Sequence, residues 1–113
     1  MQSEKVIEAL LALAQETRLA AYRLLVQTGP RGLPAGEIAS ALNVNPSTMS
    51  RHLAQLERAN LLYSWRVQRQ VFYAIDWKGT GQLLAFLTED CCQADPRIWG
   101  NKKSEDCSEC DGK

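Results

Sequence analysis

Four cysteines lie in the last fifth of this 113-residue chain: an adjacent pair, Cys91 and Cys92, and a C-x-x-C motif formed by Cys107 and Cys110. Thiolates bind soft, thiophilic ions and undergo redox exchange, and neighbouring thiols can chelate one ion in a small ring. No carboxylate cluster is placed for a hard metal, and the single histidine, His52, belongs to an earlier helical segment. The cysteines therefore indicate a soft-metal or redox function.

The number of thiols narrows the choice of ion. Zinc would take all four cysteines, but structural zinc sites usually have a close cysteine pair on both sides. Trivalent arsenic or antimony needs only two or three thiolates. The acidic neighbours of the cysteines disfavour the free thiolate, which argues against catalysis or peroxide sensing; they are Glu89, Asp90, Asp106 and Glu109. A packing role for Cys91 and an incidental C-x-x-C are the ordinary alternatives.

A second group of residues could bind DNA, because residues 45–58 form an amphipathic helical pattern. Asn45 is a good N-cap, Pro46 suits the first helical position, and one apolar stripe contains Met49, Leu53 and Leu56. Arginine can pair with guanine, glutamine with adenine, and hydroxyls with bases or phosphates. The polar face could thus read DNA, although an ordinary solvated face has the same composition; it contains Ser47, Thr48, Ser50, Arg51, Gln55 and Arg58.

The flanking segments favour the DNA-binding interpretation. A short helix over residues 34–42, with Ile38, Ala39 and Leu42 inward, and a tight turn at residues 43–45 complete a helix-turn-helix. Residues 62–67 and 70–75 alternate as the two strands of a hairpin. Its tip is polar and basic, with Arg66, Gln68 and Arg69, and suits a wing against the phosphate backbone. The absence of glycine at the tip leaves the turn type open.

The remaining pattern predicts a mainly α fold with a small β-hairpin, a winged helix-turn-helix. Further helices are expected over residues 3–14, 17–27 and 77–92. The first and last helices are more apolar than a monomer can cover, which predicts a homodimer that reads a two-fold related operator. We expect residues 1–98 to form the DNA-binding and dimerisation domain, and residues 99–113 a flexible cysteine-containing tail.

Charge and hydropathy set the cellular context. The net charge is zero, but residues 1–75 carry eight Lys/Arg and five Asp/Glu, a balance of +3, while residues 76–113 carry five and eight. The first part can therefore meet double-stranded DNA. No stretch is long and apolar enough to span a membrane, and the N-terminal residues do not resemble a signal peptide. We expect a cytoplasmic protein.

Three segments together resemble the ArsR/SmtB family of metal-responsive repressors. They are ALLALAQETRLAAYRLL, which contains Thr17-Arg18-Leu19, the helix STMSRHLAQLERANLL, and the wing ending in VFYAID. The resemblance covers about residues 9–76. It implies an intertwined homodimer through the first and last helices, acting as a repressor that an inducer releases from its operator.

Family members place their sensor sites differently. A Cys-Val-Cys site in the third helix is absent here, and so is the zinc site of the fifth helix, because this helix has no histidine. The segment Leu87-Thr88-Glu89-Asp90-Cys91-Cys92 resembles a branch with vicinal cysteines, without the third cysteine that often follows. Either Cys107 or Cys110 completes a three-thiolate site for arsenite or antimonite, or the pair alone binds methylarsenite.

The predicted function is a DNA-binding repressor that releases its operator when trivalent arsenic or antimony binds these cysteines. A thiol-redox or other soft-metal repressor of the same fold is the first alternative. A thiol-relay enzyme or metal carrier has little support, because no βαβ pattern surrounds Cys107 and no catalytic base accompanies it. We therefore predict a protein that is not an enzyme and needs no organic cofactor. The candidate DNA contacts are Ser47, Thr48, Ser50, Arg51, Gln55, Arg66 and Arg69, and the candidate metal ligands are Cys91, Cys92, Cys107 and Cys110.

Overall fold

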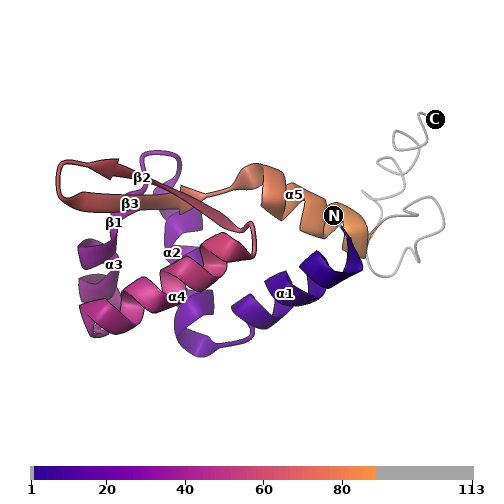
Figure 1. Ribbon diagram of the computed structural model, residues 1–113, viewed down its shortest axis with the longest axis horizontal. Helices are drawn as coiled ribbons and strands as arrows, with labels where there is room; N and C mark the ends of the chain where they lie inside the picture. The colour runs from indigo at the N-terminus through magenta and orange to yellow at the C-terminus, as the bar shows by residue number, and fades with distance from the viewer. Residues whose placement is uncertain (1, 89–113) are drawn as a thin grey trace. The chain divides into compact units, whose positions relative to one another are not determined.

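Residues 2–88 are described by the computed structural model, and helices dominate them (Figure 1). The expected winged helix-turn-helix is confirmed, with helix and strand limits within two residues of those predicted up to residue 76. In chain order the elements are α1 (Ser3–Leu13), α2 (Glu16–Thr28), β1 (Leu33–Pro34), α3 (Ala35–Leu42), α4 (Pro46–Arg58), β2 (Leu62–Val67), β3 (Gln70–Ile75) and α5 (Trp77–Leu87).

The turn between α3 and α4 forms as its asparagines predict. Asn43 ends α3 in the left-handed region, at φ 57° and ψ 48°, a conformation that asparagine tolerates better than most residues. The side chain of Asn45 caps α4 by accepting a 2.9 Å hydrogen bond from the backbone N–H of Ser47. Pro46 occupies the first turn, where no N–H is needed. These local interactions set the start of α4 on the chain.

The hairpin pairs β2 with β3 in an antiparallel register that joins Leu62 to Ile75 and Val67 to Gln70. This leaves a two-residue loop, Gln68-Arg69. Gln68 has a φ of 58°, so a residue with a side chain occupies a position that usually favours glycine. The turn that the sequence left open therefore has a left-handed first residue.

One predicted boundary was wrong: Pro34 does not belong to a helix. Leu33 and Pro34 form β1, which pairs with Tyr73 and Phe72 of β3 and makes the sheet three-stranded, in the order β1-β3-β2. Proline has no backbone N–H to donate to a neighbouring strand, so it is tolerated on an edge strand. Pro34 has that position here, because β1 is at the edge of the sheet. Figure 1 shows β1 against the hairpin, next to the start of α3.

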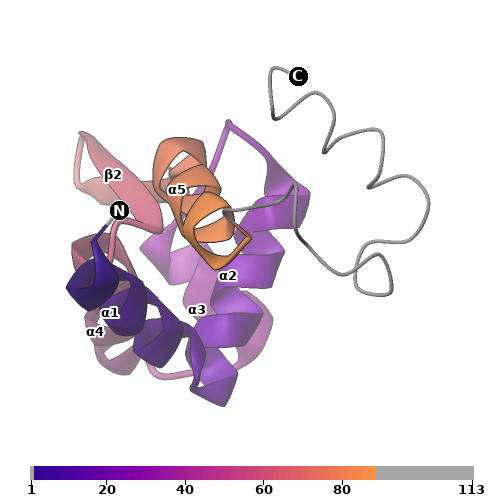
Figure 2. The same cartoon turned by 90° about the vertical axis from the view of Figure 1, so that its right-hand side faces the viewer.

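The hydrophobic core lies within the unit Met1–Leu83. The predicted stripe of α4, Met49, Leu53 and Leu56, is fully buried, and so is Ile38 of α3, while Leu42 is half-buried. α1 runs alongside α4 (Figure 2), where the Lys5 ammonium donates a 3.5 Å hydrogen bond to the carbonyl of Arg58. α4, the second helix of the helix-turn-helix and from here on the recognition helix, is thus held by apolar packing along one side and leaves the other exposed.

The first turn of α5 packs tightly against Asn60 and Leu61, which lie between α4 and β2. A Cβ at Gly79 would overlap the carbonyl oxygen of Asn60, which itself has a left-handed φ of 67°. The N–H of Asp76 donates to the carbonyl of Leu61 at 3.0 Å. Further along α5, the hydroxyls of Thr80 and Tyr22 are hydrogen-bonded at 2.6 Å. The start of α5 is therefore fixed to the segment that directly follows α4, and to α2.

The helix predicted over residues 77–92 is described as Trp77–Leu87, and its expected continuation to Cys92 lies outside the described residues. The same holds for the predicted tail and for the predicted boundary after residue 98. Within residues 2–88, no helix has both the length and the hydropathy needed to cross a membrane.

Candidate nucleic-acid interface

The outward face of α4 presents polar side chains, as the helical period requires. Ser47, Ser50 and Arg51 are exposed, whereas Thr48 and Gln55 are half-buried. The hydroxyl of Ser47 also donates a 2.7 Å hydrogen bond to Asn45 Oδ1. Its proton is therefore engaged in the helix cap, and the hydroxyl oxygen is the part of Ser47 that is left to accept a hydrogen bond from DNA.

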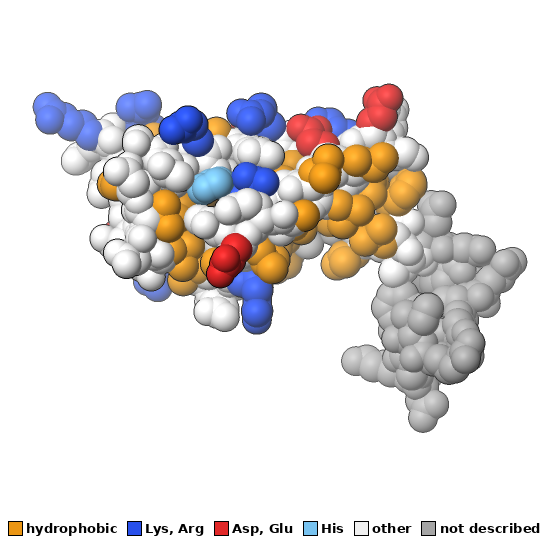
Figure 3. All heavy atoms as spheres, turned by 90° about the horizontal axis from the view of Figure 1, so that it is seen from below, with side chains coloured by type: hydrophobic (Ala, Val, Ile, Leu, Met, Phe, Trp, Pro, Cys, Tyr) orange, Lys and Arg blue, Asp and Glu red, His pale blue; other side chains and the backbone are white. Residues whose placement is uncertain are grey.

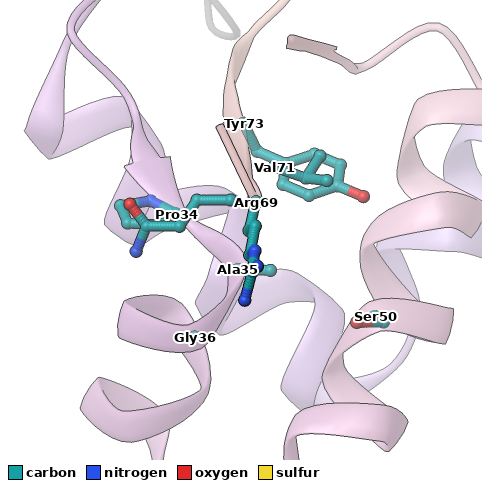
Figure 4. A pocket seen from close by; sticks show the side chains of 8 residues that line it. Pro34, Ala35, Gly36, Ser50, Arg69, Val71 and Tyr73 are labelled. Carbon is teal, nitrogen blue, oxygen red and sulfur yellow. The ribbon is translucent and has the colours of Figure 1, made fainter. Parts of the chain in front are cut away.

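Ser50 of α4 and Arg69 of the wing meet at one hollow of about 330 Å³. The other wall is the start of α3, with Ala35 and Gly36. Figure 4 shows the Arg69 side chain directed between the α3 turn at Gly36 and the α4 turn at Ser50. Arg66, also exposed, pairs across the hairpin with Val71, which lines the same hollow. The fold thus brings the predicted wing arginines to the face that carries the predicted helix contacts.

Polar and aromatic contacts within the wing determine its position. The hydroxyl of Ser64 on β2 donates to the carboxylate of Glu57 on α4, at 2.9 and 3.1 Å from its two oxygens. On the hairpin's other face, Trp65 stacks on Tyr63 and on Phe72, with ring centroids 5.3 and 5.7 Å apart. The wing is therefore attached to the recognition helix and stiffened along its length.

Glu57 also acts on a nearby phenol. Burial raises the pKa of Tyr73, and the negative charge of Glu57 raises it further. Sequence periodicity did not identify the contact between Glu57 and Ser64, because both are polar residues at half-buried positions and they belong to different elements, α4 and β2.

A second unpredicted contact involves the only histidine. Arg18 of α2 donates from Nη1 to Nδ1 of His52 on α4 at 3.2 Å, and from Nε to the carbonyl of Ala12 at the end of α1 at 2.6 Å. Burial lowers the pKa of His52, and the charges of Arg18 and Arg51 lower it further. His52 is thus neutral and acts as an acceptor at Nδ1.

Charged and apolar side chains occupy different parts of the face in Figure 3. Most of the Lys and Arg side chains in this view lie along one edge, which also carries Asp or Glu side chains at one end, and hydrophobic side chains gather over α1. Among the latter, Ile7 is 56% and Leu11 62% exposed. A positively charged edge is suited to a polyanion, and exposed leucine and isoleucine on one helix are suited to a protein contact.

The candidate metal ligands Cys91, Cys92, Cys107 and Cys110 lie outside the described residues. Within residues 2–88 there is no group of three or more His, Cys, Asp or Glu side chains that could hold a metal ion.

Comparison with known proteins reveals relatives of the same architecture. A helix-turn-helix domain family matches residues 13–63. The transcriptional activator HlyU of Vibrio cholerae is 32% identical over 92 residues, which cover 81% of this chain and 82% of HlyU. A solved structure of reduced HlyU is 31% identical, covers 80% of this chain and 93% of that chain, and has a TM-score of 0.57.

Two further solved structures are similar over the same region. One is the homodimeric winged helix-turn-helix DNA-binding domain of Mb0332 from Mycobacterium bovis, a possible ArsR-family regulator. It is 28% identical with a TM-score of 0.63, over 75% of this chain and 76% of that chain. The other is the antimony-specific transcriptional repressor AntR, 27% identical with a TM-score of 0.60, over the same shares of the two chains.

Proposed function

This chain belongs to the ArsR/SmtB family of winged helix-turn-helix transcriptional regulators, and from that premise we propose that it is a repressor released from its operator by trivalent arsenic or antimony. Members of this family are DNA-binding regulators and not enzymes. The observation that carries the proposal is the vicinal pair Cys91-Cys92, which follows the last described residue of α5, Leu87, by only a few positions.

In the proposed complex, α4 lies in the major groove of double-stranded operator DNA. Arg51 and Gln55 contact base edges, the hydroxyls of Ser47, Thr48 and Ser50 contact bases or phosphates, and Arg66 and Arg69 contact the phosphate backbone. Two observations support this assignment: the shared hollow of Ser50 and Arg69, and the exposure of most of these side chains, namely Ser47, Ser50, Arg51, Arg66 and Arg69.

The proposed active form is a homodimer. The Mb0332 domain is described as homodimeric, and α1 and α5 of this chain each expose apolar side chains that a second copy could cover. On α1 these are Ile7, Leu10 and Leu11, and on α5 they are Trp77, Leu84 and Leu87. A symmetric dimer places two recognition helices about 34 Å apart, in successive major grooves.

The inducer binds Cys91 and Cys92, with Cys107 or Cys110 as a third ligand for arsenite or antimonite. Each new arsenic–sulfur bond forms as a thiol gives up its proton and a hydroxyl group leaves the arsenic as water, so no redox change is needed. AntR supports a metalloid as the inducer, since it is described as specific for antimony.

Release of DNA follows from the position of α5. Its start contacts the segment that directly follows α4, with Gly79 against Asn60 and Asp76 hydrogen-bonded to Leu61. A ligand that distorts the far end of α5 can therefore change the orientation of the recognition helix. By thermodynamic linkage, operator DNA must weaken metalloid binding by the same factor that the metalloid weakens DNA binding.

A second candidate is a thiol-redox regulator, and the similarity to HlyU, solved in a reduced form, favours it. Two of the cysteines would then lose two electrons and two protons to a peroxide and form a disulfide. HlyU is described as an activator, so this alternative also allows the opposite effect on transcription.

Fluorescence anisotropy of a duplex selected by the wild-type chain distinguishes these functions. We expect micromolar arsenite, antimonite or methylarsenite to release the duplex, and Cys91→Ser/Cys92→Ser to abolish the release. Comparison with Cys107→Ser/Cys110→Ser tells three-thiolate from two-thiolate binding. Release by peroxide, reversed by a dithiol, without any response to metalloids would instead establish the redox function.

A further inference from the structure

The guanidinium of Arg18 joins three helices. Arg18 is in the first turn of α2, where its backbone N–H donates to the side chain of Gln15 at 2.8 Å. Its side chain then reaches the last turn of α1, with Nε on the carbonyl of Ala12 at 2.6 Å and Nη2 on that of Leu11 at 3.5 Å. Nη1 completes the set by donating to His52 of α4 at 3.2 Å.

The contact with α1 has a local explanation. The last carbonyls of a helix have no partner within the helix, and a cation near them also interacts favourably with the helix dipole. Arg18 satisfies the carbonyl of Ala12 and adds a second donor to that of Leu11, which also accepts from the N–H of Ala14 at 3.2 Å, and so it fixes the corner between α1 and α2. This function would need only one edge of the guanidinium, and it would not need a histidine on α4.

The contact with His52 extends this fixed corner to the recognition helix. His52 follows Arg51 directly and lies one helical turn before Gln55. A rotation of α4 that displaced the His52 ring would therefore also move these two candidate base contacts. The guanidinium is planar and presents its donors in a rigid fork, which makes it a stiff connection between the α1 carbonyls and the imidazole.

We propose that Arg18 is a positioning residue for DNA binding, whose guanidinium holds the recognition helix against the end of α1 through the ring of His52. α1 is also one of the two helices with exposed apolar side chains, so the same arginine connects the orientation of α4 to the proposed dimer contact. The inference rests on the proposed DNA contact through α4 but is independent of metalloid sensing.

The test compares specific with non-specific DNA affinity by fluorescence anisotropy of the full chain. The specific probe is the duplex selected by the wild-type chain from a random pool, and the non-specific probe is a duplex of random sequence. The variants are Arg18→Lys, His52→Leu and the double substitution, at a temperature well below the melting transition of each. Arg23→Lys, the same change on the exposed side of α2, is the matched control.

Arg18→Lys keeps the charge but removes the fork. We expect it to weaken specific binding about tenfold and non-specific binding about twofold or less, because non-specific affinity depends on charge. The double variant should be no more than about twofold worse than either single variant, since both remove the same contact. Arg23→Lys should leave both affinities unchanged. Any of three results overturns the proposal. Arg18→Lys could weaken binding to both probes equally, or could keep full specific affinity. The double variant could lose affinity by the product of the two single losses.

A rescue variant and a pH profile separate positioning from general stability. In His52→Gln, the amide oxygen can accept from Nη1, and we expect near wild-type specific affinity. The charged groups facing His52 are Arg18 from α2 and Arg51 on α4, while the end of α1 presents the carbonyls of Leu11 and Ala12. Protonation of His52 therefore breaks the contact, so the specific affinity of the wild type should fall as the pH drops through the lowered pKa of His52, and that of His52→Gln should not.

Every result decides between the hypotheses. If the wild type binds no duplex at all, the proposed DNA-binding function fails and not merely the role of Arg18. If Arg18→Lys unfolds at the assay temperature, His52→Leu provides the answer, because it leaves both α1 carbonyl bonds in place. If His52→Leu then binds the specific duplex as tightly as the wild type does, the proposal is overturned.

Discussion

Gly79 and Gly81 provide a matched pair of substitutions that measures how tightly α5 packs on α4. Both are in α5, two residues apart, so replacing either by alanine makes the same change in helix propensity. A Cβ at Gly79 would overlap the backbone carbonyl of Asn60, whereas a Cβ at Gly81 has nothing within 4 Å. Only Gly79→Ala therefore forces a backbone movement.

The expected magnitudes follow from these two environments. Replacing a helical glycine by alanine stabilises by about 1 kcal/mol, which we expect for Gly81→Ala. Gly79→Ala gains the same amount but is overpacked against a backbone atom, which costs about 1–3 kcal/mol. The propensity gain cancels in the comparison, so Gly79→Ala should be about 1–3 kcal/mol less stable than Gly81→Ala. At about 4 °C per kcal/mol, the melting temperatures should differ by roughly 4–12 °C.

Thermal unfolding followed by circular dichroism is the assay, with all variants at one protein concentration because dimerisation makes the melting temperature concentration-dependent. The wild type should melt between the two variants, or together with Gly79→Ala where a small backbone shift relieves most of the overlap. If Gly79→Ala melts as high as Gly81→Ala, the close contact between α5 and Asn60 does not exist, and the proposed route from α5 to the recognition helix loses its basis.

Three further predictions concern the recognition helix and the wing. The pKa of His52 is lowered in the folded state, so the unfolded chain takes up its proton first as the pH falls. Stability measured by urea unfolding should therefore decline below pH 6.5 in the wild type and less in His52→Gln. Gln68→Gly should raise the free energy of unfolding by about 1 kcal/mol, because residue 68 has a φ of 58°; an unchanged or lower value would argue against this turn. Arg69→Gln should reduce the salt dependence of DNA binding by about one unit of log–log slope, and an unchanged slope would remove Arg69 from the phosphate contacts.

Local chemistry explains which parts of the fold could be predicted from the sequence. Asn45 and Pro46 indicate the start of α4, and the helical period predicts the buried stripe that begins at Met49. The two hairpin strands have the predicted limits, since apolar and polar residues alternate along both. In each case the signal lies within one element, where spacing alone determines which side chains share a face.

Contacts between elements that are distant along the chain were not predicted. The edge strand β1 is only two residues long, too short to show a period, and its proline suggested a helix start. The contact between Arg18 and His52 joins residues 34 positions apart, and Gly79 meets Asn60 only because the hairpin returns the chain to the end of α4. Neither pattern nor composition distinguishes these residues from solvated neighbours. The predicted contacts of Ser47, Ser50 and Arg69 with DNA, and the ligand role of the cysteines, stay predictions.

The hydrogen bonds from Ser64 to Glu57 join the wing and the recognition helix into a single DNA-contacting unit. Neither part can then slide along the duplex without the other, so the interval between groove and backbone contacts within one half-site is constant. An operator that gains or loses one base pair inside that interval is out of phase with the protein for both contacts at once. We expect insertions or deletions of base pairs to be tolerated only between half-sites, where the DNA-contacting units of the two subunits adjoin.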